Sequence, residues 1–119
     1  MAIRYHITLK DPEKARGDDY LFSFIAHGAD EFAEELEDVL RSDEFFERWR
    51  RMQPESEVID PELASSDPNA TVKGEQHDLQ IELIVITTVP GSVLKHHMNL
   101  LAGNGWELRD VSKASVNSP

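Results

Sequence analysis

The chain has 119 residues, of which 39% are hydrophobic and 29% charged, so we expect one soluble domain with one core. Its formal net charge of −11 argues against nucleic acids and anionic membranes as partners, because both attract lysine and arginine. The absence of cysteine excludes disulfides and thiolate chemistry. Since no signal peptide or membrane-spanning run is recognisable, we expect a cytoplasmic protein, and no motif indicates a metal or another cofactor.

Two strands are predicted near the start of the chain. Ile3, Tyr5, Ile7 and Leu9 alternate with polar residues, which is the period of a strand with one buried face. Turn-forming residues follow this run. The aromatic-rich stretch 20–26 is then predicted to be its hairpin partner.

Two helices are expected next. The first is predicted to begin with Asp30 as its N-cap, and its apolar face consists of Phe32, Leu36, Val39 and Leu40. The second is predicted to begin after Ser42, with acidic residues in its first turn and arginines in its last, which complements the helix dipole. Its apolar residues fall within one arc and are Phe45, Phe46, Trp49 and Met52.

The segment 53–74 is rich in proline, serine and acidic residues, and it is predicted to be a mobile acidic loop. A strand follows over 79–88, whose second half is expected to be central and buried on both faces. Ser92 is predicted to cap the next helix. The apolar face of that helix consists of Val93, Leu94, His97, Leu100 and Leu101.

The end of that helix carries a recognisable pattern. Gly103 or Gly105 is expected to end the helix through a positive φ, after which 106–111 return as a strand. Residues 1–113 are expected to form one domain, and 114–119 a disordered tail.

Residues 98–108 resemble the Leu-Asn-x-Leu-Gly-x-x-Gly-Trp-Glu-Leu ending of a widespread group of small uncharacterised bacterial domains. The matching residues are Asn99, Leu101, Gly105, Trp106, Glu107 and Leu108. Met98 replaces leucine, Ala102-Gly103 reverses the usual order, and the resemblance covers only the last third of the chain. It implies a small α+β fold, in which this segment is a helix, a tight turn and an edge strand, and it implies no known activity.

Together these elements predict an α+β two-layer sandwich, with a mainly antiparallel sheet of about four strands and helices on one face. The expected element order is ββααβαβ. A ferredoxin-like split βαβ arrangement is one candidate, and the order of strands in the sheet stays open.

Acidic residues gather in the middle of the chain, where residues 28–62 hold thirteen Asp or Glu against four Arg. This clustering predicts a non-enzymatic protein-interaction or regulatory module that docks a basic protein surface. The residues expected at that surface are Glu34, Glu37, Asp38, Phe45, Phe46 and Trp49. In the plainer interpretation the acids provide solubility and the aromatics seal the core. A homodimer sealed through the three aromatics is a further hypothesis.

The alternative hypothesis is a small-ligand-binding protein or an enzyme that uses the open face of the sheet, with His6 or His27 as acid or base. That face is expected to display Arg4, His6, Ser23, His27, Glu82 and Arg109. Because no pattern matches a catalytic motif, no catalytic residue is assigned. His97 is predicted to be a core histidine bonded to a backbone group, and its neighbour His96 lies too far round the helix for both to bind one metal.

Overall fold

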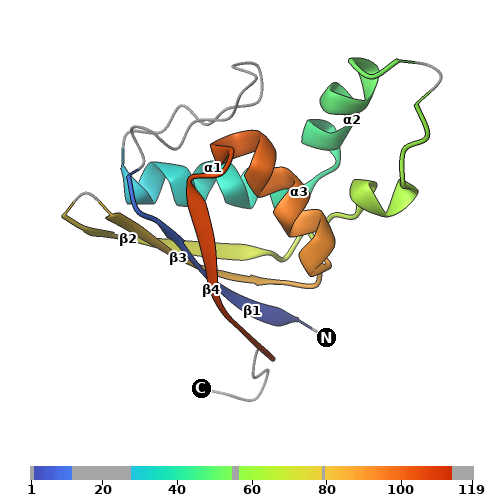
Figure 1. Cartoon of the computed structure of the whole chain (residues 1–119). Coiled ribbons are helices and arrows are strands. Elements are labelled where there is room, and N and C mark those ends of the chain that lie inside the picture. Colours follow the sequence, from blue (N-terminus) through green and yellow to red (C-terminus); the bar gives the residue numbers. More distant parts are fainter. Residues whose placement is uncertain (1, 12–27, 55–56, 79, 114–119) are drawn as a thin grey trace.

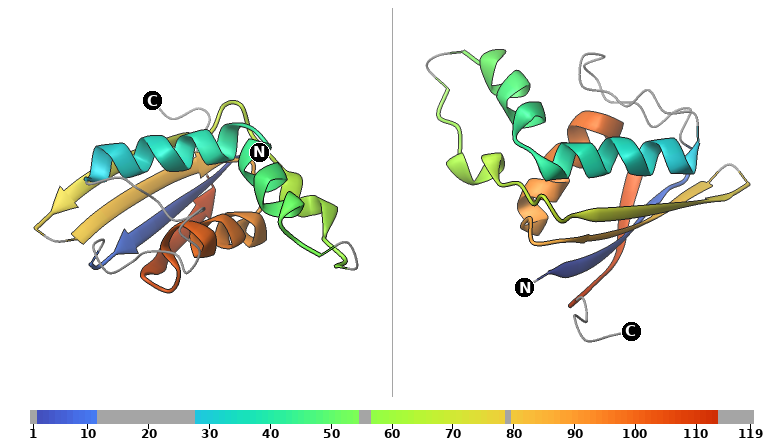
Figure 2. Two further views of the ribbon diagram at one scale, coloured as in Figure 1. Left: turned by 90° about the horizontal axis from the view of Figure 1, so that it is seen from above. Right: turned by 180° about the vertical axis from the view of Figure 1, so that it is seen from behind.

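The computed structural model describes residues 2–11, 28–54, 57–78 and 80–113. These residues form a four-stranded antiparallel sheet with helices on one face, which confirms the predicted α+β two-layer class (Figure 1). In both views of Figure 2 the helices α1 and α3 lie on the same side of the sheet. Among the described helices, none has the length and apolar character needed to cross a membrane. The expected strand at 20–26 and the expected tail at 114–119 lie outside the described residues.

The strands lie in the order β2-β3-β1-β4, and each pair of neighbours is antiparallel. Their bounds are Ile3–Leu9 for β1, Thr71–His77 for β2, Gln80–Thr87 for β3 and Trp106–Lys113 for β4. The helices are α1 (Ala29–Arg41), α2 (Glu44–Arg51) and α3 (Gly91–Ala102), with a 3₁₀ helix η1 at Pro61–Ala64.

The connectivity explains why strands that follow one another through a helix do not lie side by side in the sheet. The chain runs from β1 through α1 to β2, with β3 between these two strands, and from β3 through α3 to β4, with β1 between them. With α2 and η1 as additions before β2, this is the ferredoxin-like split βαβ arrangement. The strand order that the sequence left open is therefore determined by the two helical crossovers.

The core lies between the sheet and the helices. Inward-facing residues of β1 and β3 alternate with outward-facing ones, so both strands present one apolar face. The largest fully buried side chains include Ile7, Leu9, Phe32, Leu36, Leu40, Ile81, Leu83 and Met98. Each such side chain contributes roughly 1.5–3 kcal/mol through burial. The prediction that β3 is buried on both faces is wrong, since Ile84 and Ile86 are only half-buried on the side without helices.

The strand β2 departs from the sequence prediction, because its first residues, 71–74, fall within the predicted loop. Its only inward apolar side chain is Val72, and its other positions are mostly polar and exposed. Gly74 lies under the start of α1, where an added Cβ would approach the carbonyl oxygen of Ala29 to 2.4 Å. The glycine therefore permits α1 to pack closely on β2, and it also removes the alternation that would have indicated a strand.

The helix starts differ by one or two residues from those predicted. Gly28 is the N-cap of α1, so Asp30 lies in the first turn, where a carboxylate still interacts favourably with the helix dipole. Asp43 rather than Ser42 is the N-cap of α2, and Pro90 rather than Ser92 is the N-cap of α3. The end of α3 is as predicted, since Gly103 has φ 56°.

Candidate functional site

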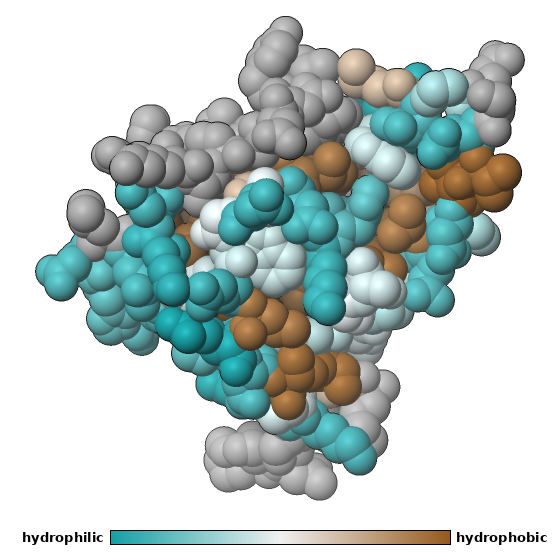
Figure 3. Space-filling view, in the orientation of Figure 1, coloured by the Kyte–Doolittle hydropathy of each residue, from teal (hydrophilic) through white to brown (hydrophobic). Residues whose placement is uncertain are grey.

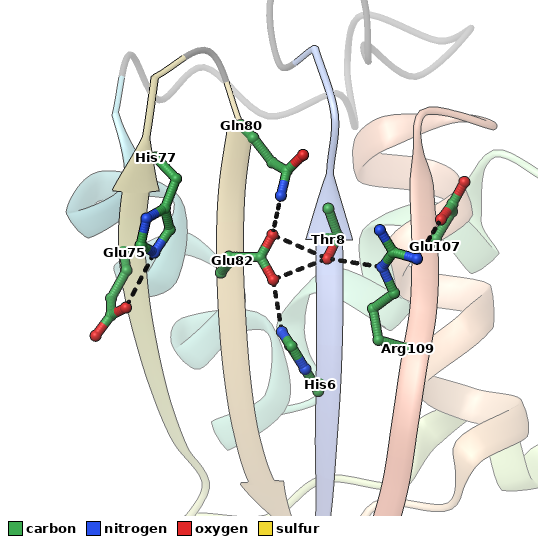
Figure 4. Close-up of polar contacts among 8 residues, drawn as sticks. All are labelled: His6, Thr8, Glu75, His77, Gln80, Glu82, Glu107 and Arg109. Carbon is green, nitrogen blue, oxygen red and sulfur yellow. Dashed lines mark hydrogen bonds and ion pairs between the residues drawn. The ribbon is translucent and has the colours of Figure 1, made fainter.

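The face of the sheet opposite the helices carries a connected set of polar side chains, shown in Figure 4. Glu82 of β3 lies at its centre. The carboxylate of Glu82 accepts a hydrogen bond from Thr8 Oγ1, which lies 2.9 and 3.0 Å from its two oxygens. His6 Nε2 lies 2.6 Å from Glu82 Oε1, and the side-chain amide of Gln80 donates to the other oxygen. Three neighbouring side chains thus hold one carboxylate in a fixed orientation.

These bonds determine the charge of Glu82. Burial raises the pKa of its carboxyl group, but the hydrogen bonds from His6, Thr8 and Gln80 favour the ionised form more strongly, so the pKa lies below its usual value. Glu82 is therefore a carboxylate at neutral pH. Its acceptor positions are directed at groups of the same sheet.

The set continues onto β4 through an irregularity in the strand. Ile7 pairs with Leu108 and His6 with Asp110, so Arg109 is an extra residue with no partner across the ladder. The bulge directs Arg109 onto the open face, where its Nε donates to Thr8 Oγ1 at 3.3 Å. Its guanidinium also lies 3.4 Å from Glu107, which is ion-paired with Lys10 at 2.9 Å.

An open depression of about 370 Å³ lies beside Glu82, over β1, β2 and β3. It is lined by His6, Lys73, Glu75, His77, Glu82 and Ile84. His77 Nε2 lies 3.2 Å from Glu75, so two histidine–carboxylate pairs flank the depression. Such pairs can exchange protons or hold a small polar molecule. No group of three or more potential metal ligands is found among the described residues.

The acidic residues expected to bind a partner lie on α1 and have different surroundings. Glu34 and Asp38 are exposed. Glu37 is half-buried, forms an ion pair with Arg41 at 3.0 Å and accepts a hydrogen bond from the backbone N–H of Val72 at 3.0 Å. Glu37 therefore attaches α1 to β2, whereas the side chains of Glu34 and Asp38 are exposed.

The aromatic residues of α2 are mostly enclosed. Phe45 and Phe46 are buried, and Trp49 is half-buried. The Phe45 ring meets the His97 ring edge-on at 5.6 Å, and Trp49 meets His96 in the same way at 4.5 Å. These rings attach α2 to α3, which leaves only part of Trp49 at the surface.

A groove of about 290 Å³ separates α1 from α2. Its lining combines carboxylates with apolar surface and one arginine, and consists of Asp38, Val39, Ser42, Glu44, Phe45 and Arg48. The Arg48 guanidinium lies 5.6 Å from the centre of the Phe45 ring. The groove therefore brings together Asp38 and Phe45, two residues that the sequence assigned to one docking surface.

His97 is a core residue, as predicted, with 2% of its surface exposed. The predicted bond to a backbone group is not found at its buried Nδ1, which has no hydrogen-bond partner among the described residues. The same holds for the buried Nε2 of His96. Burial, together with the neighbouring His96, lowers the pKa of His97 to about 4. Burial also lowers the pKa of His96. Both rings are therefore neutral at pH 7 and pack as apolar groups against α2.

The sequence predicted that residues of β1, β3 and β4 share a polar open face, but it predicted few of the contacts among their side chains. His6, Glu82 and Arg109 do share the face, linked by Thr8. Arg4 is half-buried on the same face, opposite Ile86 and Ser112, and takes no part in the described network. Predicted members Ser23 and His27 lie outside the described residues. Lys73, Glu75 and His77 were missed because β2 was not recognised as a strand.

Comparison of the chain with protein-family models, with curated proteins and with solved structures finds no match. The resemblance of residues 98–108 to small bacterial domains is therefore still a prediction. A functional interpretation has to proceed from the two surfaces described above, the acidic helix with its groove and the polar face of the sheet.

Proposed function

We propose that the protein is a non-enzymatic interaction module that docks a basic protein surface on the exposed side of α1 and in the adjoining α1–α2 groove. One observation carries the proposal: the exposed residues of α1 are Asp30, Glu31, Glu34, Asp38 and Arg41. The only base among them, Arg41, is bound to Glu37 and donates to the backbone carbonyl of Ala70 at 2.9 Å. The helix thus presents carboxylates on a rigid element.

The groove supplies a place for the aliphatic part of a basic side chain. Val39 and the Phe45 ring provide apolar surface, and Asp38 and Glu44 provide carboxylates beside it. A lysine or arginine of the partner would place its methylene groups on the apolar surface and its charge between the carboxylates. Complementary charge of this kind raises the association rate more than the affinity.

A matched pair of double variants tests this proposal. In Glu34→Lys/Asp38→Lys, the charge of the docking face is reversed, whereas Glu57→Lys/Glu75→Lys makes the same net change at exposed positions away from α1. Each protein is immobilised, and retention of a cytosolic protein that the wild type retains at low salt is measured in salt steps. We expect the α1 pair to abolish retention and the control pair to preserve it.

Two outcomes would contradict the proposal. One is an equal loss in both variants, because net charge alone would then explain the binding. The other is retention that is insensitive to both salt and charge reversal, since exposed electrostatic contacts are screened within about 8–10 Å at moderate ionic strength.

A second candidate function is supported by the depression on the open face. Two histidine–carboxylate pairs, the Lys73 ammonium and the side chain of Ile84 line one shallow space. This mixture suits a small polar molecule with an apolar part, bound through charge-assisted hydrogen bonds. In this function Glu82 would hold His6 in position and His6 would contact the ligand.

Thermal shift with a panel of inorganic phosphate, small carboxylates and small amines tests this candidate. A true ligand at about 100 times its dissociation constant should add roughly 2.7 kcal/mol to the free energy of unfolding of the wild type. The same compound should have no effect on His6→Ala or Lys73→Ala. Stabilisation that persists in both variants would place the ligand elsewhere, and no stabilisation by any compound would reject the candidate.

A further inference from the structure

Within the described residues, the outer strand β4 combines an unpaired edge with exposed apolar side chains. In the described part of the chain, β1 is the only strand that pairs with β4. Leu108 and Val111 are 36% and 50% exposed, and they are two of the four large apolar residues exposed on the described surface. Figure 3 shows apolar surface over β4 on the side turned to the viewer. An open edge with apolar side chains is a surface to which another strand can add.

The bulge places these two side chains on the same face of the sheet. Leu108 lies opposite Ile7 and Val111 opposite Tyr5, and both of these β1 side chains belong to the core. In a regular strand, residues three positions apart would point to opposite faces. Because Arg109 is an extra residue between the two pairings, both apolar side chains lie on the helix side of the sheet.

We propose that β4 pairs in antiparallel fashion with β4 of a second copy of the chain, about a two-fold axis between Arg109 and Asp110. In this register Leu108 lies opposite the partner's Val111, and Arg109 lies opposite the partner's Asp110. Two-fold symmetry repeats both pairs, so the contact has two apolar pairs and two pairs of opposite charge. The two sheets would then join into one continuous sheet of eight strands.

The sequence of β4 favours a second copy over another strand as the occupant. Bulges and charged side chains normally protect an edge from indiscriminate pairing. A strand that pairs here has to match the bulge, offer an acidic group to Arg109 and a basic group to Asp110, and place apolar residues beside them. The same strand, reversed, meets all of these conditions. The proposal is independent of the docking function, because α1 lies over β2 and β3, far from this edge in the sheet.

This seam differs from the homodimer that the aromatic residues suggested. Phe45 and Phe46 are buried within the chain, and Phe45 contacts the His97 ring. A dimer through those rings would require α2 to leave α3. A dimer through β4 uses side chains that are already exposed.

The mass in solution, measured by sedimentation equilibrium over a range of concentrations, tests the proposal. We expect the wild type to pass from one chain to two as its concentration rises. Val111→Glu should shift the transition to a concentration about tenfold higher or more, since two apolar pairs are lost at once. The matched control is Val58→Glu, which changes a residue that is 96% exposed and lies away from β4, and it should leave the transition unchanged.

Exchanging the charges of Arg109 and Asp110 provides a second test. It compares several variants, so it does not depend on whether any one of them folds. Arg109→Asp and Asp110→Arg should each weaken the dimer, because each places like charges opposite one another twice. The double variant Arg109→Asp/Asp110→Arg restores opposite charges and should restore the dimer. A wild type that has the mass of one chain at all concentrations would overturn the proposal. So would a dimer that persists in Val111→Glu, or a double variant that dimerises no more strongly than the two single variants.

Discussion

Acidification from pH 7 to pH 4 is expected to lower the free energy of unfolding by about 3 kcal/mol through His97 alone. The folded-state pKa of His97 is about 4, whereas that of an unfolded histidine is about 6.5. Between these values the unfolded chain binds a proton that the folded chain does not, so stability falls as the pH falls. Each unit of difference in pKa corresponds to about 1.4 kcal/mol.

The surroundings of His97 explain the size of this effect. The Phe45 ring packs on it edge-on, His96 lies beside it, and within the described parts of the chain no acceptor lies within hydrogen-bond distance of its buried Nδ1. A charged imidazole in this position would have to reach water, which requires α2 to separate from α3. Acid is therefore expected to act on the contact between these two helices.

Urea denaturation at pH 7, 5.5 and 4 measures this dependence, with His97→Leu as the test variant and His77→Leu as the control. The leucine fills a similar volume without a titrating group, so the loss between pH 7 and pH 4 should shrink by about 3 kcal/mol relative to wild type. His77 is exposed and lies outside the contact between α2 and α3, so its replacement controls for the loss of a histidine as such. Parallel curves for wild type and His97→Leu would show that His97 is not responsible.

Replacement of Asp67 by alanine is expected to lower the free energy of unfolding by about 4 kcal/mol. The buried carboxylate of Asp67 accepts hydrogen bonds from Thr87 Oγ1 at 3.0 Å, from the N–H of Thr88 at 2.9 Å and from the N–H of Asn69 at 3.0 Å. Hydrogen bonds to a charged group contribute about 1.5–3 kcal/mol each, and their loss leaves the fully buried Thr87 hydroxyl without its acceptor. The backbone N–H of Asp67 also donates to Leu40 at 2.7 Å, so this residue joins α1 to the end of β3.

Asp60→Ala is the matched control for this prediction. Among the described residues, the side chain of Asp60 accepts one hydrogen bond, from the backbone N–H of Glu62 at 2.9 Å, and Asp60 is exposed. Its replacement should lower the free energy of unfolding by only about 1 kcal/mol. Equal losses in the two variants, measured by urea denaturation at pH 7, would contradict the role assigned to Asp67. Burial raises the pKa of Asp67, but its hydrogen bonds from Thr88, Asn69 and Thr87 lower it by more, so the contribution of Asp67 is lost as the pH falls from the usual aspartate value through this lower pKa.

Periodicity in the sequence predicted those elements whose apolar residues face one layer. In β1 the alternation from Ile3 to Leu9 is regular, and in α3 the buried residues recur at helical spacing. In β2, Val72 is the single buried apolar side chain and Gly74 takes the next inward position, so no alternation is present. The strand forms because β3 pairs with it and α1 covers it, which are contacts that no local pattern contains.

The candidate site, like the fold, could be predicted only in part. Strand parity placed His6 and Glu82 on one face, because alternate residues of a strand share a face. Which residues lie opposite each other depends on register, so the bond that Thr8 makes to Glu82 could not be foreseen. On α2, the apolar arc was evident, but only the position of α3 shows that Phe45 and Trp49 cover two histidines.

The central position of β1 has a consequence for how the sheet is assembled. Its two ladders join Ile3 to Thr87 on one side and to Lys113 on the other, so every partner of the strand lies in the last third of the chain. The hairpin of β2 and β3, by contrast, closes through a short turn from His77 to Gln80. Closing a long loop costs more conformational entropy than closing a short one, and contacts between distant residues form slowly. The strand β1 joins the two halves of the sheet. Its pairing therefore depends most on the rest of the chain having folded.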